Sequence, residues 1–315
     1  MFEEIINKIK SAGNILIFTH INPDGDAVGS SFALMKALRK IGKKADIIFE
    51  EPLSDYFAFF NFEYLTADTY KGGYDLKISL DSSDTKRLGR RAEFFTGDTI
   101  LIDHHGTNLR YAEICYVDAD SPSTGEIIFD LIEEMGIERD KDISDGLYAA
   151  MMTDTGGFMY SNTTAETHRK AALAIESGAD YVTLNRKLNV EKSYESQRLS
   201  ALCVEKMEFF HDRKICLSYF DNELCGKYGL SLDDLNGMSA TVSSIKDVEI
   251  AIFISETVKG QIKVSLRSVD YADVSEISVA FGGGGHKKAA GFVAENISYA
   301  ELKAKLIEMA EQRVG

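Results

Sequence analysis

Three short strand-like runs, each followed by acidic residues or histidines, constrain this 315-residue chain more than any other feature. They span residues 14–18, 75–80 and 99–102, and they lead into His20, Asp81 and Asp103. Short, mainly apolar runs are typical of strands buried on both faces of a parallel sheet. Because such strands end at one edge, where open α/β folds bind ligands, the repetition predicts a functional site at that edge.

The chain is long enough for two hydrophobic cores, since single cores usually stop growing near this length. Helical patterns separate the early strands, so we predict an N-terminal α/β domain with a mostly parallel sheet flanked by helices. Residues 190–210 are charged, amphipathic and free of glycine, which indicates a long helix. The remainder reads as a smaller α+β domain with a hairpin turn at Lys259–Gly260. The predicted boundaries are 1–187, a helical linker at 188–210, and 211–315.

Charge and composition exclude several classes of protein. A formal net charge of −15 argues against a broad surface for long nucleic acid, which requires a basic face. A small anionic substrate remains possible if bound metal ions offset the acidic surroundings. No stretch approaches the roughly 20 apolar residues that cross a bilayer, and the N-terminus is acidic, so we expect no membrane association and a cytoplasmic protein. The four cysteines lack metal-binding spacing, which fits a reducing compartment.

The stretch from His20 to Asp26 carries three metal-capable side chains within seven residues, between a predicted strand and a predicted helix. Asp24, Asp26, Asp81 and Asp154 each follow a run that should approach a core. Four converging carboxylates would repel one another and rise in pKa unless cations are present, and two divalent ions supply the matching charge. A single Asp-x-Asp is more often a turn or helix cap, but its recurrence with other acids at element ends favours a dinuclear metal site.

Mixed imidazole and carboxylate ligands suit Mn²⁺, with Mg²⁺, Fe²⁺ or Co²⁺ as possible substitutes. The absence of thiolates from the pattern weakens a structural zinc site. Two such ions about 3.5–4 Å apart can activate a shared hydroxide and polarise a phosphoryl oxygen. The pattern therefore predicts phosphoester hydrolysis.

A second candidate site lies near the C-terminus, where four glycines at 282–285 precede His286. Glycines let a backbone approach a ligand and direct its amides at phosphate oxygens, although a glycine run alone is more often a flexible loop. Arg267 ends a predicted strand and could grip a phosphate with two hydrogen bonds, although an isolated strand arginine is usually a surface charge. We predict that Arg267, His286 and the glycines Gly283, Gly284 and Gly285 bind substrate.

At this point the order of the motifs becomes specific, and the chain resembles the DHH phosphoesterase superfamily. The matching stretches are His20 to Asp26, Asp81-Ser82-Ser83-Asp84, Asp103-His104-His105-Gly106 and Thr153 to Phe158. Residues 282–292 resemble the signature of the superfamily's DHHA1 domain. Within the superfamily the chain is similar to compact bacterial oligoribonucleases of the NrnA type, which also dephosphorylate 3′-phosphoadenosine 5′-phosphate (pAp), and to related cyclic di-AMP and pApA phosphodiesterases.

The resemblance implies a ligand set for each ion. One metal would be held by His20, Asp24 and Asp81, and the second by Asp26, Asp81, His104 and Asp154, with Asp81 bridging. Asp103 has no ligand position in that scheme, so we expect it to orient a histidine. His105 would face the site, either protonating the leaving oxygen or binding phosphate.

The resulting expectation is a homodimeric, Mn²⁺-dependent phosphoesterase acting on short oligoribonucleotides, pAp or dinucleotides, and not on long duplexes. A cyclic di-AMP phosphodiesterase is the alternative within the class. An exopolyphosphatase or pyrophosphatase is less favoured, because those enzymes resemble the chain only up to the predicted linker. A nucleotide-binding regulator with a vestigial metal site is disfavoured by the intact ligand positions.

Overall fold

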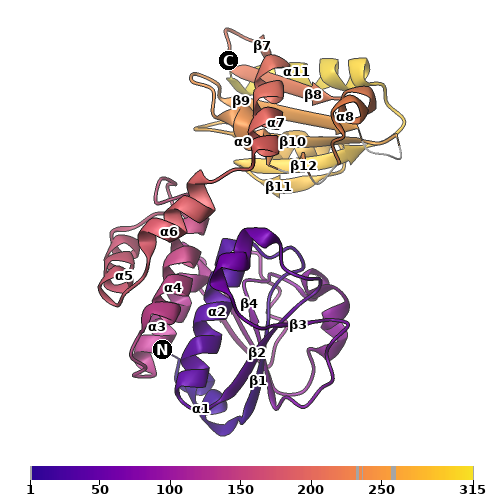
Figure 1. Ribbon diagram of the computed structural model, residues 1–315. Helices are drawn as coiled ribbons and strands as arrows, with labels where there is room; N and C mark the ends of the chain where they lie inside the picture. Colours follow the sequence, from indigo (N-terminus) through magenta and orange to yellow (C-terminus); the bar gives the residue numbers. More distant parts are fainter. Residues whose placement is uncertain (1, 232–233, 236, 257–259, 315) are drawn as a thin grey trace. The chain divides into compact units, whose positions relative to one another are not determined.

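The structure is a computed structural model that describes residues 2–231, 234–235, 237–256 and 260–314. The chain forms two compact units, residues 1–191 and 192–315, which are described separately (Figure 1). Within the described residues, no helix is both long and apolar enough to cross a membrane.

The first unit contains a parallel six-stranded sheet in the order β3-β2-β1-β4-β5-β6. From β1 the chain adds β2 and β3 on one side, then returns to place β4 on the other, so the strand order reverses between β1 and β4. Phe18 at the end of β1 lies opposite Ser79 near the end of β4, which brings the two carboxyl ends together. This reversal is the position at which doubly wound sheets bind ligands. The strands are β1 (Asn14–Phe18), β2 (Lys44–Phe49), β3 (Leu65–Thr66), β4 (Leu76–Leu80), β5 (Thr99–Asp103) and β6 (Ile114–Val117).

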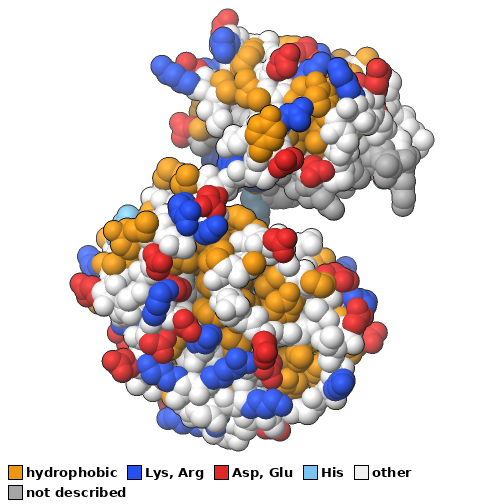
Figure 2. All heavy atoms as spheres, viewed as in Figure 1, with side chains coloured by type: hydrophobic (Ala, Val, Ile, Leu, Met, Phe, Trp, Pro, Cys, Tyr) orange, Lys and Arg blue, Asp and Glu red, His pale blue; other side chains and the backbone are white. Residues whose placement is uncertain are grey.

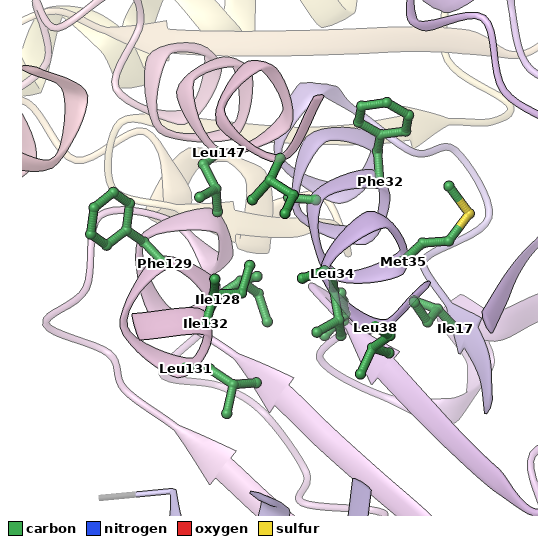
Figure 3. Close-up of a cluster of buried hydrophobic side chains, with 14 of the residues drawn as sticks. Ile17, Phe32, Leu34, Met35, Leu38, Ile128, Phe129, Leu131, Ile132 and Leu147 are labelled. Carbon is green, nitrogen blue, oxygen red and sulfur yellow. The ribbon is translucent and has the colours of Figure 1, made fainter. Parts of the chain in front are cut away.

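Both faces of this sheet are covered, which explains the unbroken apolar run of β1. Ile15 and Ile17 belong to the large core under the helices, whereas Leu16 and Phe18 face a smaller cluster beneath the 3₁₀ segment η2 (Thr85–Phe94). Figure 3 shows side chains of α2 and α3 filling the large core. The remaining elements are α1 (Glu3–Ser11), α2 (Gly25–Lys40), η1 (Asp55–Phe60), α3 (Thr124–Glu134), α4 (Lys141–Asp154), α5 (Ala165–Glu176), α6 (Tyr181–Asn185) and η3 (Arg186–Val190).

Helices α2 and α4 pack closely because glycines meet at their crossing. A Cβ atom built on Gly29 would lie 2.5 Å from the carbonyl oxygen of Gly146, and one on Gly146 would lie 2.7 Å from that of Gly29. Both helices carry predicted site residues, Asp26 in the first turn of α2 and Asp154 at the end of α4. The glycine contact therefore sets the spacing of the two carboxylates.

The second unit contains a mixed sheet in the order β11-β12-β10-β9-β8-β7, in which only β8 and β9 are parallel among the described pairs. One face packs on α11 and the other on α7 and α9. Its strands are β7 (Glu208–Phe210), β8 (Ile215–Phe220), β9 (Ile250–Glu256), β10 (Ile262–Ser268), β11 (Gly284–His286) and β12 (Ala289–Ala294). Its helices are α7 (Tyr194–Glu205), α8 (Asn222–Tyr228), α9 (Met238–Ser243), α10 (Ser275–Ala280) and α11 (Tyr299–Val314).

The predicted α/β class with a second α+β unit is confirmed, but the helix predicted over 190–210 is wrong in extent. Helix α7 begins only at Tyr194, because the Ser193 side chain accepts a hydrogen bond from Ser196 N at 3.0 Å and caps it. Residues 208–210 leave the helix and pair with β8 as an edge strand. A three-residue strand is too short to produce a recognisable alternation. The predicted domain boundaries remain predictions, and the Lys259 half of the predicted hairpin turn lies outside the described residues.

The glycine contact predicts that Gly146→Ala destabilises the protein by about 1–3 kcal/mol, the usual cost of overpacking. The matched control is Gly226→Ala in α8, where an added Cβ would meet no atom within 4 Å. That change should leave the free energy of unfolding unchanged or raise it by up to about 1 kcal/mol. Chemical denaturation measures both, and equal stability of the two variants would contradict the proposed packing constraint.

Candidate metal centre

The predicted site residues of the first unit gather at the carboxyl edge of its sheet. His20 follows β1, Asp81 follows β4, and Asp103 ends β5. Asp24 caps α2, where its side chain accepts a hydrogen bond from Ala27 N at 3.1 Å. The set brought together is His20, Asp24, Asp26, Asp81, Asp103, His104, His105 and Asp154.

Two groups of ligand atoms form around His20 and His104. His20 Nε2 lies 3.7 Å from Asp24 Oδ2 and 3.7 Å from Asp81 Oδ2. His104 Nε2 lies 3.5 Å from Asp154 Oδ2, 3.9 Å from Asp26 Oδ2 and 3.5 Å from Asp81 Oδ1. The two oxygens of Asp81 therefore face different groups, which is the arrangement of a carboxylate that bridges two cations.

The N-terminus of α3 holds Asp26 in place. Thr124 N donates to Asp26 Oδ2 at 2.7 Å, and Gly125 N donates to Asp26 Oδ1 at 2.8 Å. The Thr124 hydroxyl also donates to Asp81 Oδ1 at 3.2 Å. Free amides and the helix dipole at a helix N-terminus favour a carboxylate there. Gly125 must be small, because an added Cβ would lie 2.2 Å from that of Ala150.

Neither Ser123 nor Thr124 was among the site residues predicted from the sequence. Ser123 does cap α3, accepting a hydrogen bond from Glu126 N at 3.1 Å. The additional contact of Thr124 with the site was missed, since no local pattern marks it. The sequence feature that could have indicated this contact is Gly125, a small residue directly after two hydroxyl residues.

Asp103 orients His105 and is fully buried. Its Oδ1 lies 2.8 Å from His105 Nδ1 and accepts a hydrogen bond from His104 N at 2.9 Å, while its Oδ2 accepts one from Asn108 Nδ2 at 2.5 Å. Among the described residues, Asp103 belongs to none of the three clusters able to hold an ion. Asn108, which also bonds Ser82 O at 3.0 Å, was not anticipated.

The backbone orients the imidazole of His104, since its Nδ1 lies 3.2 Å from the carbonyl oxygen of Ser121. A proton on Nδ1 leaves Nε2 free to bind a cation. Asp81 adopts a left-handed backbone conformation with φ of 55°, which costs a non-glycine residue about 1–3 kcal/mol and is typical of functional positions.

Burial and repulsion raise the pKa values of three of the carboxyl groups, whereas at Asp24 the effect of burial is outweighed by the neighbouring His20, which lowers the pKa. Burial, followed by the charges of Asp81, Asp154 and Asp24, raises the pKa of Asp26 well above its usual value. Burial and Asp24 likewise raise the pKa of Asp81. Burial is also the largest cause that raises the pKa of Asp154, to about 6. Because the ionised forms of these carboxyl groups are destabilised, bound cations would stabilise the site.

The donor set fits divalent cations bound by oxygen and nitrogen. Carboxylate and imidazole atoms form all three clusters found among the described residues, and none of the free cysteines takes part. Two of those clusters, His20–Asp24–Asp81 and Asp26–His104–Asp154, correspond to the two ligand sets that the resemblance implied, apart from the bridging Asp81 in the second. The third joins Asp81, His104 and His105.

In the second unit, Arg267 and His286 lie in one row across three strands. Arg267 of β10 is opposite Ala289 of β12, which is opposite His286 of β11. Directly opposed residues of antiparallel strands project from the same face, so both side chains lie on the same side of the sheet. Both are exposed, and Arg267 Nε lies 3.4 Å from the Ser239 hydroxyl.

The glycine run is not the open loop that was expected. Gly284–His286 forms strand β11, and two of the glycines are required by the packing of the chain on itself. A Cβ on Gly283 would lie 2.4 Å from Gly291 O, and Gly285 has φ of 137° with Ala289 O only 2.5 Å from an added Cβ. Gly284, in contrast, has open space beside it. Internal packing therefore accounts for Gly283 and Gly285, whereas their role in substrate binding remains a prediction.

A parallel α/β sheet with imidazoles and carboxylates at its switch point, in clusters that could hold a metal ion, is typical of metal-dependent enzymes of the α/β class. Comparison with protein families matches residues 14–153 to the DHH family, N-terminal domain, and residues 212–315 to the DHHA1 domain. The chain therefore carries a DHH-family N-terminal domain and a C-terminal DHHA1 domain, which confirms the resemblance seen in the motifs.

Several relatives match over most of the chain. It is 29% identical over 305 residues to the bifunctional oligoribonuclease and PAP phosphatase NrnA of Thermus thermophilus, covering 96% of this chain and 90% of that protein. It is 27% identical over 312 residues to the probable bifunctional oligoribonuclease and PAP phosphatase NrnA of Streptococcus mutans, covering 96% and 98%. An exopolyphosphatase-related protein from Bacteroides fragilis has the same fold, with a TM-score of 0.89 at 28% identity over 99% of this chain and 95% of that one.

The raised pKa of Asp154 predicts how the stability of the metal-free protein depends on pH. Its folded pKa of about 6 exceeds its ordinary value of 3.8, so its contribution to stability is present at pH below 3.8 and is lost as the pH rises through about 6. Asp154→Asn removes this titration. In EDTA, the variant should therefore gain stability relative to wild type between about pH 4 and pH 7. Thermal unfolding across this range measures the difference, and a difference independent of pH would contradict the electrostatic account.

Proposed function

We propose that the protein is a Mn²⁺-dependent phosphoesterase that releases mononucleotides from short oligoribonucleotides and removes a phosphate from pAp. The observation that carries the proposal is Asp81, whose two oxygens face two separate clusters of ligand atoms. The names of the relatives from Thermus thermophilus and Streptococcus mutans support the substrate class.

Each predicted metal ligand of the first unit has a role in this proposal. His20, Asp24 and Asp81 would hold one cation, and Asp26, Asp81, His104 and Asp154 the other. When bound, two divalent cations supply a nucleophile at neutral pH and neutralise charge on the phosphoryl oxygens. The chain's own residues fix the geometry, since α3 holds Asp26 and Ser121 holds His104.

His105 acts as the general acid. The hydrogen bond to Asp103 is the largest cause that raises the pKa of His105, so its protonated form persists to higher pH. The bond occupies Nδ1 and leaves Nε2 to deliver a proton to the leaving oxygen. Asp103 therefore serves through His105 and not as a ligand.

In this proposal, Arg267 and His286 of the second unit bind a terminal phosphate of the substrate. Arg267 and His286 project from one face of the sheet, and Gly284 leaves room beside them. An arginine and an imidazole in one row suit a terminal phosphate. A grip on the terminus favours short substrates over internal cleavage of long strands.

Surface charge supports the same substrate size. On the face shown in Figure 2, lysines and arginines are interspersed with aspartates and glutamates and form no continuous basic stripe. The net charge of −15 also disfavours long duplexes. We assign the protein to the cytoplasm, where its four free cysteines would stay reduced, and retain the homodimer as an expectation of the family resemblance.

The proposed activity is tested with pApA, a labelled short RNA and pAp, each incubated with Mn²⁺ or EDTA. We expect turnover of all three that requires Mn²⁺ and falls by about 10²-fold or more in His104→Ala, since even residues that only support a ligand cost 10- to 100-fold. His211→Ala, an exposed histidine of the second unit, is the control and should retain full activity. Turnover that persists in EDTA, or none on any substrate, would show the proposal to be wrong.

Three other substrates and one variant decide between the remaining functions. The Bacteroides fragilis structure is described as exopolyphosphatase-related, so pyrophosphate and polyphosphate belong in the same assay. Preference for them would favour that class, and a large preference for cyclic di-AMP over pApA would favour a cyclic dinucleotide phosphodiesterase. Full cellular function of His104→Ala would instead favour a nucleotide-binding regulator.

The Asp103–His105 pair predicts a change in the pH profile. Asp103→Asn replaces the carboxylate that raises the pKa of His105 with a neutral amide, so the protonated form is lost at lower pH. The alkaline limb of kcat/KM for pApA should move to lower pH in this variant. Rate measurements on the Mn²⁺-loaded proteins between pH 6 and pH 10 give the shift, and an unmoved limb would argue against His105 as the general acid.

A further inference from the structure

Arg87 lies beside the metal centre and is fixed there through its backbone. It stands in the first turn of η2, where Asp84 Oδ1 accepts hydrogen bonds from Lys86 N at 2.6 Å and Arg87 N at 3.1 Å. Arg87 O accepts a hydrogen bond from Ile21 N at 2.7 Å, the residue directly after His20. Its main chain thus joins the Asp81–Asp84 segment to the loop between β1 and α2.

The guanidinium of Arg87 has no partner among the residues that the structure describes. Among the described residues, no carboxylate lies within 4.0 Å of the guanidinium and none forms a hydrogen bond with it, although the residue is only partly exposed. Its positive charge acts on His105, where it opposes the raised pKa of the imidazole. In a chain whose net charge is −15, this side chain forms no ion pair with the described residues.

The two other arginines of η2 show how unusual this is. Arg90 pairs with Glu50, Glu51 and Asp68 on the surface. Arg91 is fully buried, donating to Ile48 O at 2.7 Å and Thr19 O at 2.9 Å, and so ties together the ends of β1 and β2. Arg90 and Arg91 stabilise the fold of this segment, whereas Arg87 is available to bind an external anion.

We propose that Arg87 binds the phosphate group undergoing cleavage, through its non-bridging oxygens, within the first unit. This inference rests on the proposed phosphoesterase function and adds a substrate-binding residue outside the metal ligands. A guanidinium offers two parallel donors that match a phosphate in geometry and charge. The backbone bond from Ile21 N to Arg87 O places this arginine beside the loop that carries His20. The role differs from that of Arg267, which would hold the terminal phosphate.

The direct test measures inorganic phosphate binding to the Mn²⁺-loaded protein by calorimetry. Arg87→Gln should weaken phosphate affinity by about 10- to 100-fold, the loss expected for hydrogen bonds to a charged group, and Arg87→Lys should lose less. Lys86→Gln removes one positive charge from the neighbouring exposed position and is the matched control. An equal loss in Lys86→Gln, unchanged affinity in Arg87→Gln, or no phosphate binding by wild type would overturn the proposal.

Two further measurements separate phosphate binding from a structural role. Mn²⁺ affinity and the melting temperature should be unchanged in Arg87→Gln, and a parallel loss of Mn²⁺ affinity would show that Arg87 only supports the His20 loop. With pApA and the dinucleotide ApA, which lacks the terminal phosphate, kcat/KM should fall by the same factor. A fall confined to pApA would place Arg87 at the terminus and contradict the proposal.

These readouts also distinguish the inference from the function on which it rests. Phosphate binding that depends on Arg87, in a protein that hydrolyses none of the tested nucleotides, would uphold the anion site and reject the proposed activity. Hydrolysis with an Arg87→Gln variant of unchanged phosphate affinity would uphold the activity and reject the role of Arg87.

Discussion

Repulsion among four carboxylates at one edge of a sheet is the constraint on which the first unit depends. Asp26 and Asp81 are almost completely buried, and burial together with neighbouring carboxylates raises the pKa values of Asp26, Asp81 and Asp154. Burying a charge costs free energy even when the charge is paired. The surrounding fold must therefore hold these carboxylates close together despite their repulsion. Helix α3 does so for Asp26 with two backbone amides, which provide partial positive charge without a competing side chain.

The same constraint explains the tight packing of the helices behind the site. Gly29 and Gly146 let α2 and α4 approach, and Gly125 lets α3 reach Asp26 past Ala150. Larger residues would displace the helices that carry Asp26 and Asp154, and a shift of an ångström is enough to spoil metal geometry. In this unit, the geometry of the metal ligands therefore depends on the close packing of the helices.

The sequence was sufficient for the parts of the fold and site that follow local rules. Buried strands read as apolar runs, and the motif order placed His20, Asp81 and Asp103 at strand ends, where they lie. Contacts between distant segments were not predictable, because Thr124 and Asn108 look like an ordinary cap and turn residue until the helices and loops dock. Strand β7 was missed because three residues carry no period. The packing of Gly283 and Gly285 was not predictable, because internal packing and the approach of a ligand both require glycine.

The arginines of η2 show why residue type alone does not identify function. Within five positions, Arg91 is buried and bonded to strand-end carbonyls, Arg90 is exposed and bonded to three carboxylates, and Arg87 has no partner among the described residues. Burial lowers the pKa of Arg91 to about 10 even though Glu50 opposes the shift. An arginine whose hydrogen-bonding capacity is already used can only support the fold. One that is held in place by its backbone while its guanidinium stays free can bind a phosphate without first breaking an internal contact, and this difference in free energy favours Arg87 over its neighbours as the anion-binding residue.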